Sequence, residues 1–287
     1  MPPERLDRKR VPSFGVCIYC GRHADKVKLT DEHTMPFSLG GNVILEKASC
    51  LDCANVTKNF EGYLGRKVFG DFRTHAGTQT RNKKDRPSSL QAKITLRGRE
   101  FVREFDVGDH PFFTSFPVLP VAGILSGDQP RREYKWVNAH VFHSIPPNIR
   151  ETLGMHSHEK ATLHYPDITV DTNKFARAIA KIAYCTAVMK WGIGGFRPLI
   201  IRQLILGEYP FVPYLVGLHP NASMAVANPE VMHEVSFAIT EYKRLALITA
   251  RVRLFANSGA GDEGPPSYEV VVGAPSIGWR QTPNPYE

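Results

Sequence analysis

The chain lacks long hydrophobic runs. Nowhere among its 287 residues do uninterrupted apolar side chains approach the roughly 18 to 20 that a membrane-spanning helix needs. Its start, MPPERLDRKR, has no apolar stretch of the kind that a secretory signal contains. No internal repeat is visible, which argues against a solenoid. With 42% hydrophobic residues the chain can still bury a substantial core, so we expect a soluble, cytoplasmic protein of two domains.

Cysteine is scarce, and its arrangement excludes a disulfide framework. Of five cysteines, four form two Cys-x-x-Cys pairs, Cys17 with Cys20 and Cys50 with Cys53. Two such knuckles about thirty residues apart complete a tetrahedron of thiolates and predict a structural Zn²⁺ site. A closed shell of four thiolates leaves no position for a reacting group, so this metal holds the module together. The fifth, Cys185, lies in an apolar helical pattern and is interpreted as a buried small hydrophobe.

An excess of acid is also absent: the formal net charge is +8. The whole excess lies in the segment from Arg66 to Arg103, called the basic strip here. This segment contains eleven Lys or Arg and three Asp or Glu. A clustered charge of this kind favours contact with phosphates over a merely solvated surface. The residues expected to bind nucleic acid are Arg66, Lys67, Arg73, Arg81, Lys83, Lys84 and Arg86.

Composition divides the chain into four parts. Residues 1–13 are predicted to be a basic tail, 14–73 a compact cysteine module, 74–89 a basic linker without large apolar groups, and 90–287 a second domain of unknown role. The second domain alternates apolar and polar residues in a pattern typical of strands, interrupted by one long helix. We therefore predict the α+β class, with a small zinc-stabilised module followed by a mostly antiparallel sheet and a central helix.

Particular segments carry this fold prediction. A hairpin is expected over 92–107 with its turn at Gly98, and another over 233–256 with its turn near 242–244. The helix is expected to begin after Asp171 or Thr172 as its cap and to continue to about residue 192. Shorter segments are predicted as well: strands within 116–125, 159–170, 213–219 and 267–275, and a helix within 197–208.

Between the two knuckles lies LTDEHTMPFSLGGN, residues 29–42. Its proline and glycine pair interrupt any helical period, so it is interpreted as strand, loop, strand. Together with the knuckles it resembles the HNH endonucleases, in the branch whose ββα-metal fold is pinned by two Cys-x-x-Cys pairs. The residues that carry the resemblance are Cys17-x-x-Cys20, Thr30–His33, Pro36, Ser38–Asn42, Cys50-x-x-Cys53, Asn55 and Asn59.

The resemblance implies a metal-dependent hydrolase that cleaves phosphodiester bonds in DNA. By it, His33 is the general base, and Glu32 is a ligand of a catalytic Mg²⁺ or Mn²⁺ ion, with Asp31 as the fallback. Asn42 matches the asparagine that orients the loop. Neighbouring side chains of a strand point to opposite faces, so the loop after His33 has to twist for Glu32 and His33 to act together.

The helix after the second knuckle departs from the family pattern. Ala54 stands where the family commonly has His or Asn, and an alanine cannot bind a metal ion. Asn55 is the preferred replacement ligand, with Asn59 on the same helix face behind it and Glu61 as a third possibility.

Three hypotheses follow. The first is an HNH endonuclease whose basic strip binds the DNA backbone without reading bases, with an affinity that falls steeply with salt. The second is a zinc-stabilised nucleic-acid-binding protein that has lost catalysis, with Ala54 as the relic. The third makes the C-terminal sheet domain the effector and the cysteine module its targeting device.

Overall fold

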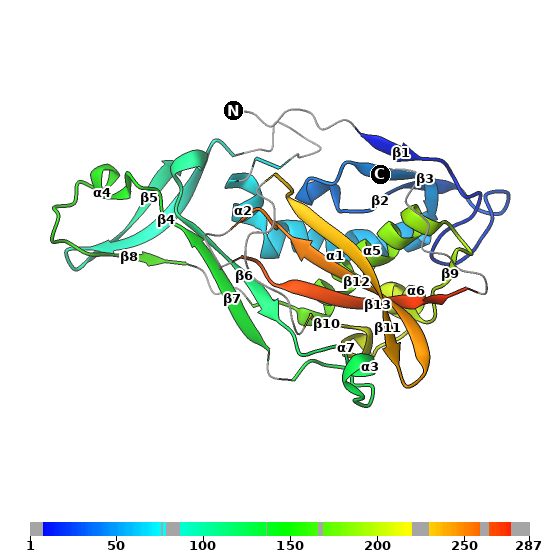
Figure 1. The fold of residues 1–287 in the computed structure, drawn as a ribbon. Coiled ribbons are helices and arrows are strands. Elements are labelled where there is room, and N and C mark those ends of the chain that lie inside the picture. The colour runs from blue at the N-terminus through cyan, green and yellow to red at the C-terminus, as the bar shows by residue number, and fades with distance from the viewer. Residues whose placement is uncertain are drawn as a thin grey trace.

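A 20-residue helix, α5 (Thr172–Trp191), lies at the centre of the fold (Figure 1). The computed structural model describes residues 8–75, 77–78, 87–135, 137–165, 169–219, 230–258 and 264–276. The architecture is α+β, as predicted: an N-terminal module built around a ββα unit is followed by antiparallel sheets around α5. In the described part of the chain, no helix is both long and apolar enough to cross a membrane.

The N-terminal module begins earlier than the sequence predicted. Its elements are β1 (Lys9–Val11), β2 (Leu29–His33), the 3₁₀ turn η1 (Phe37–Leu39), β3 (Val43–Cys50), α1 (Leu51–Tyr63), the π-helical turn η2 (Leu64–Val68) and α2 (Gly70–His75). β2 and β3 pair antiparallel, and β1 adds to β3 in parallel. Part of the segment predicted to be a loose tail is therefore an edge strand of this sheet.

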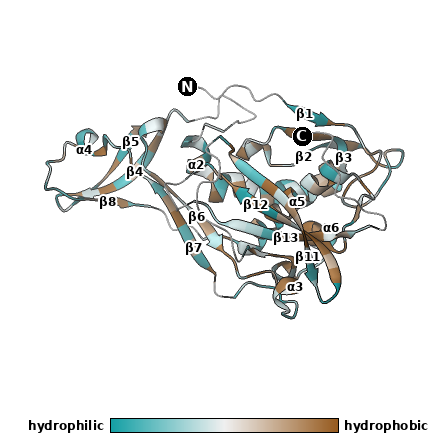
Figure 2. Cartoon of the chain, viewed as in Figure 1, coloured by the Kyte–Doolittle hydropathy of each residue, from teal (hydrophilic) through white to brown (hydrophobic). Residues whose placement is uncertain are grey.

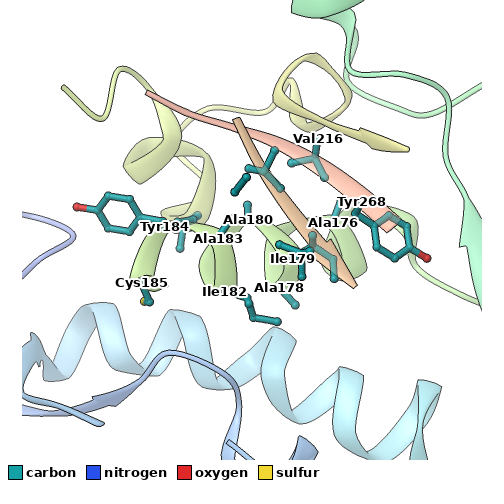
Figure 3. Close-up of a cluster of buried hydrophobic side chains, with 14 of the residues drawn as sticks. Ala176, Ala178, Ile179, Ala180, Ile182, Ala183, Tyr184, Cys185, Val216 and Tyr268 are labelled. Atoms are coloured by element: carbon teal, nitrogen blue, oxygen red, sulfur yellow. The ribbon is translucent and has the colours of Figure 1, made fainter. Parts of the chain in front are cut away.

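Helix α5 follows the rules from which it was predicted. The Asp171 carboxylate accepts a hydrogen bond from the Lys174 backbone N–H at 2.9 Å, and Gly192 at φ 71° ends the helix. Its side chains are buried almost all round from Phe175 to Val188. Figure 3 shows why: Ile182 and Cys185 point toward a helix of the N-terminal module, while Ala180 and Ala183 face the strands on the other side.

The largest sheet covers one side of α5. Its strands are β9 (Phe196–Arg197), β10 (Val216–Leu218), β11 (His233–Tyr242), β12 (Leu245–Leu254) and β13 (Ser267–Pro275). The order is β10-β13-β12-β11, all antiparallel, and β9 pairs with β13. The β11–β12 hairpin turns at Lys243 and Arg244, both at positive φ, which confirms the turn predicted there.

A separate arm extends from the central body (Figure 1). It contains β4 (Ser89–Leu96), β5 (Arg99–Asp106), β8 (Ala161–His164) and α4 (Ile149–Thr152), and the ribbon of β6 (Phe112–Val118) and β7 (Asn138–Ser144) leads to it. The predicted turn at Gly98 joins β4 to β5. Figure 2 shows hydrophilic and hydrophobic residues alternating along these strands, as expected of a sheet with one face packed and the other in water. The arm has a small core of its own around Ile94 and Phe105.

Three short α-helices and a 3₁₀ turn, η4 (Val107–Asp109), complete the described part of the chain. The helices are α3 (Gly123–Ser126), α6 (Ile201–Leu206) and α7 (Val212–Leu215). α6 lies within the predicted 197–208 helix. α3 occupies residues predicted as the end of a strand: β6 stops at Val118, and the Gly127 residue at φ 81° ends the helical turn instead.

The main hydrophobic core is continuous from the N-terminal module into the sheet behind α5. One cluster of buried side chains includes Leu45 of β3, Phe60 of α1, Ile182 of α5 and Val270 of β13. Two tyrosines tie the layers together. The Tyr184 hydroxyl donates to the Ile18 carbonyl at 2.6 Å, and the Tyr19 hydroxyl lies 3.2 Å from the sulfur of Cys185. Cys185 is buried, as the sequence predicted.

Candidate zinc centre and candidate active site

The four cysteines of the two knuckles converge on one point. Cys17 and Cys20 lie on a tight turn, Cys50 ends β3, and Cys53 lies in the first turn of α1. Their sulfur atoms all lie within 4.8 Å of one another, and those of Cys20 and Cys50 are 3.7 Å apart. Zinc–thiolate bonds of about 2.3 Å give a tetrahedral edge of about 3.8 Å, so the cluster has the size of a Zn²⁺ site.

Hydrogen-bond donors surround three of the sulfur atoms. Arg22 donates to the sulfurs of Cys20 at 3.3 Å and Cys50 at 3.1 Å, and the Cys50 backbone N–H donates to Cys17 at 3.4 Å. The neighbouring Cys53, followed by backbone donors, lowers the pKa of Cys17 to about 4, whereas the same contact raises the pKa of Cys53 and burial raises that of Cys50. Four thiolates around Zn²⁺ carry a net charge of −2, which the guanidinium of Arg22 partly offsets.

At the end of β2, consecutive side chains point to opposite faces. A register shift between Thr30 and Glu32 places Asp31 at an irregular position, but its carboxylate stays outside and pairs with Arg10 at 2.7 Å. Glu32 points inward and is only 5% exposed. His33 is half-buried, and its ring lies 5.6 Å from that of Phe37, centroid to centroid.

Glu32 meets an unpredicted partner from α5. The ammonium of Lys181, a residue with no exposed surface, lies 2.8 Å from Glu32 Oε1 and 2.5 Å from Glu61 Oε1. The same ammonium donates to the His33 backbone carbonyl. The contact between Lys181 and Glu61 Oε1 is an ion pair, and its geometry is not that of a hydrogen bond. Three elements, β2, α1 and α5, thus share one buried cation.

The pKa values of Glu32 and Lys181 are both raised, for different reasons. Burial raises the pKa of Glu32, and the attraction of Lys181 only partly offsets that effect. Burial acting alone would lower the pKa of Lys181, but the carboxylates of Glu32 and Glu61 outweigh it and hold the pKa above its ordinary value. Lys181 is therefore a permanent cation at physiological pH.

The loop after His33 is held in one shape by close backbone contacts. Its N–H groups at Leu39 and Gly41 donate to the Pro36 carbonyl at 2.9 and 3.2 Å. A Cβ added at Gly41 would lie 1.9 Å from the Met35 carbonyl oxygen, so only glycine fits there. Asn42, predicted to orient the loop, is half-buried, and its backbone carbonyl accepts from Lys9 of β1 at 3.1 Å.

His233 of β11 anchors this loop from the far end of the chain, and sequence reasoning did not identify it. Its Nδ1 accepts from the Phe255 backbone N–H at 3.1 Å, so its Nε2 carries the proton and donates to the Leu39 carbonyl at 2.7 Å. The neutral ring therefore serves as both donor and acceptor. Burial lowers the pKa of His233 to about 4.

We expect this anchor to fail in acid. The folded-state pKa of His233 is below its ordinary value of 6.5, so the unfolded chain binds more protons between pH 6.5 and about 4. The stabilisation is complete above pH 6.5 and is lost as the pH falls toward 4, by about 3 kcal/mol. Urea unfolding of wild type and His233→Ala at pH 7 and pH 4.5 measures it: the gap between them should narrow in acid. An equal gap at both pH values contradicts the prediction.

Helix α1 presents the predicted asparagines to solvent. Asn55 and Asn59 are exposed on its outer face together with Lys58, whereas Ala54 is buried on the inner face. His33 and Glu32 are neighbours in the sequence, but their side chains lie on opposite faces of β2. Asn55 and Asn59 point away from both, toward solvent. Of the candidate helix ligands, Glu61 is the one whose side chain meets the surroundings of Glu32.

The basic residues divide between surface and interior. Arg66 and Lys67 are exposed on η2. Arg73 is half-buried, and its guanidinium donates to the Gly65 carbonyl at 3.2 Å. Arg81, Lys83, Lys84 and Arg86 lie outside the described residues. Further along the strip, Lys93 and Arg97 form exposed ion pairs with Glu100 and Glu159.

The arrangement suits a structural zinc ion but not the expected catalytic divalent ion. Among the described residues, the four cysteines are the single set of three or more His, Cys, Asp or Glu whose ligand atoms converge. The Glu32 carboxylate is paired with Lys181, and the outward-facing amides of Asn55 and Asn59 are not placed to complete a ligand set with it. Glu61, the third possibility, is paired with the same ammonium.

Comparison with known proteins gives one match. A family model described as HNH endonuclease matches residues 17–69, from the first cysteine of the zinc cluster to the end of η2. The matched segment contains all four cysteines, Glu32 and His33. Neither the comparison with curated proteins nor that with solved structures found a match. Residues 17–69 thus form a module of the HNH endonuclease family, as the sequence motifs predicted.

Proposed function

We propose that this protein is an endonuclease that hydrolyses phosphodiester bonds in DNA, with His33 as the general base. The observation that carries the proposal is His33 itself. It ends β2 of a module of the HNH family, it is partly accessible, and the loop beside it is fixed at both ends. An HNH module acts on nucleic acid, and the chain adds a basic strip directly after it.

The chemistry asked of His33 is proton transfer. Its imidazole takes a proton from the water that attacks phosphorus, a role suited to a group that titrates near neutrality. The Phe37 ring packs against the imidazole, and the Lys181 ammonium holds the carbonyl of the same residue, so backbone and ring are both restrained. The bond from water oxygen to phosphorus replaces the bond between phosphorus and the 3′ oxygen, which leaves and takes up a proton from solvent. The products, by the family resemblance, then carry 3′-hydroxyl and 5′-phosphate ends.

Binding is assigned to the basic strip and the outer face of α1. Arg66 and Lys67 extend the exposed polar face that Asn55, Lys58 and Asn59 begin, and neutral amides and cations of this kind suit a phosphate backbone. The strip residues Arg73, Arg81, Lys83, Lys84 and Arg86 are proposed as further contacts. Such contacts position the duplex and give a salt-dependent affinity without sequence specificity.

The family resemblance implies two metal ions, a structural one and a catalytic one. The side chains of this protein fit the first and not the second. The four cysteines fit a structural Zn²⁺, which has no open coordination position and so acts through the fold. A catalytic Mg²⁺ or Mn²⁺ bound by Glu32, Asn55 and Asn59 does not fit the side chains as they lie. No step of the proposed reaction is routed through that ion.

Cleavage of supercoiled plasmid tests the proposal. We expect the zinc-loaded wild type to convert the plasmid to open-circular and linear forms, and His33→Ala to lower the rate at least about a hundredfold, because a general base contributes that much. The reactions are run with Mg²⁺, with Mn²⁺ and with neither ion added. His23→Ala is the matched control, since His23 is an exposed histidine of the same module outside the β2–β3 hairpin.

One observation favours a second function. Ala54 stands where the family commonly has a metal ligand on the helix, and Lys181 forms an ion pair with Glu32, the expected acidic ligand. A protein that binds nucleic acid without cleaving it would tolerate both changes. If wild type and His33→Ala bind DNA equally and neither cuts under any of the three conditions, the binding function replaces the nuclease proposal. Cutting by His33→Ala at the wild-type rate would instead remove His33 from the mechanism.

A further inference from the structure

The Lys181 ammonium lies where two carboxylates and a carbonyl converge. Its three oxygen neighbours are Glu32 Oε1, Glu61 Oε1 and the carbonyl of His33. An ammonium group has three N–H donors and no acceptor, so it can donate to Glu32 and to the His33 carbonyl while forming an ion pair with Glu61. They come from β2 and α1, whereas the lysine comes from α5, more than a hundred residues later in the chain.

Burial makes this a built site. Lys181 has no exposed surface, Glu32 is 5% exposed, and the Glu61 side chain is 19% exposed. Two carboxylates so close together in a site of low polarity repel each other and require a cation between them. Oxygens from carboxylates and a backbone carbonyl are also the ligands that divalent ions such as Mg²⁺ and Mn²⁺ bind.

We infer that Lys181 supplies the positive charge of this site in place of the divalent ion that the HNH resemblance assigns to Glu32. A second cation beside the ammonium would meet like-charge repulsion at close range in a buried setting. On the inner face of α1, the position where the family commonly has His or Asn is the buried Ala54, which cannot bind a metal ion. Lys181 is also a positioning residue: it holds the carbonyl of His33 and therefore the backbone that carries the imidazole.

This inference goes beyond the proposed function, because it concerns the charge of the site whether or not DNA is cut. Its test is accordingly a binding measurement. Zinc-loaded full-length protein is titrated with Mn²⁺, and electron paramagnetic resonance measures the free ion. The proteins compared are wild type, Glu32→Gln, Lys181→Met and the Lys181→Met/Glu32→Gln double variant.

We expect wild type and Glu32→Gln to bind equal numbers of Mn²⁺ ions. Lys181→Met, whose side chain is similar in size but uncharged, should gain one site that binds Mn²⁺ about tenfold or more tightly than any site of the wild type. The double variant should lose that site.

Two results would overturn the inference. One is a Mn²⁺ site in the wild type that Glu32→Gln removes, since it would show a divalent ion at Glu32 beside Lys181. The other is a folded Lys181→Met that gains no site. Should Lys181→Met fail to fold, the comparison of wild type with Glu32→Gln decides alone. The Mn²⁺ titrations do not depend on DNA cleavage. If the protein cuts no DNA, the nuclease proposal fails while the inference about Lys181 is still tested.

Discussion

Replacing both cysteines of the second knuckle, Cys50→Ser and Cys53→Ser, should abolish zinc binding and unfold the N-terminal module. The apparent free energy of structural Zn²⁺ binding is about 10–16 kcal/mol, as large as the whole stability of a typical protein. The effect should also reach α5, because Tyr184 bonds to the first knuckle at Ile18. Zinc content by mass spectrometry and thermal unfolding measure both losses.

Cys185→Ala is the matched control for this experiment. Cys185 is buried like Cys50 and Cys53 but lies outside the zinc cluster, with its sulfur against the hydroxyl of Tyr19. The variant should keep one zinc ion per chain and lose only about 1 to 2 kcal/mol, as small losses of buried volume and of one weak contact do. A double serine variant that retained its zinc and its melting temperature would refute the assignment of the cluster.

Lys181→Met should destabilise the protein by about 3–5 kcal/mol at pH 8, because breaking a buried ion pair from one side leaves uncompensated charge. Glu32 and Glu61 would then face each other without a cation. Adding Glu32→Gln and Glu61→Gln to Lys181→Met should recover much of the loss, since the buried charges then disappear together. Urea unfolding free energies of the single and triple variants measure the effect.

The pH dependence of Lys181→Met provides an independent check. Burial already raises the pKa of Glu32, and losing the ammonium raises it further. A carboxyl whose folded-state pKa lies above its unfolded value stabilises the fold below the unfolded value, and that stabilisation is lost as the pH rises through the folded one. The variant should therefore be closer to wild type at pH 5 than at pH 8.

Lys174→Met is the control for the loss of a lysine. It lies on the same helix, but its ion pair with Asp171 is 3.3 Å long and its side chain is 45% exposed. Exposed pairs contribute less than about 1 kcal/mol, so this variant should stay near wild-type stability at every pH. Equal stability of wild type and Lys181→Met at pH 8 would mean that the buried pair contributes nothing.

Local patterns determined what the sequence could predict. The Asp171 cap, the turn at Gly98 and the strand over 267–275 each follow from the chemistry of a few neighbouring residues, and each is present in the structure. The two Cys-x-x-Cys pairs likewise have a spacing that depends only on a knuckle and a tetrahedral ion. Such features need no knowledge of what packs against them.

Features that depend on distant partners were missed. The sequence alone does not identify Lys181, because a lone lysine in a helix ordinarily lies on the solvated face. The signal was present, since Lys181 interrupts the apolar run from Ala178 to Val188 of a helix that is buried all round. Nothing local identifies its partners, which lie about 120 to 150 residues away. His233 was missed for the same reason, because its two hydrogen bonds reach Leu39 and Phe255.

Because its buried acids pair with Lys181 of α5, the HNH module depends on a part of the chain that lies outside it. Severed from the rest of the chain after residue 75, it would keep its zinc ligands but expose the apolar surface that α5 covers and leave Glu32 and Glu61 without their counter-charge. Recombination could not transplant such a module by its motif alone. A transplant would have to carry the motif together with α5, which begins about a hundred residues downstream of the module.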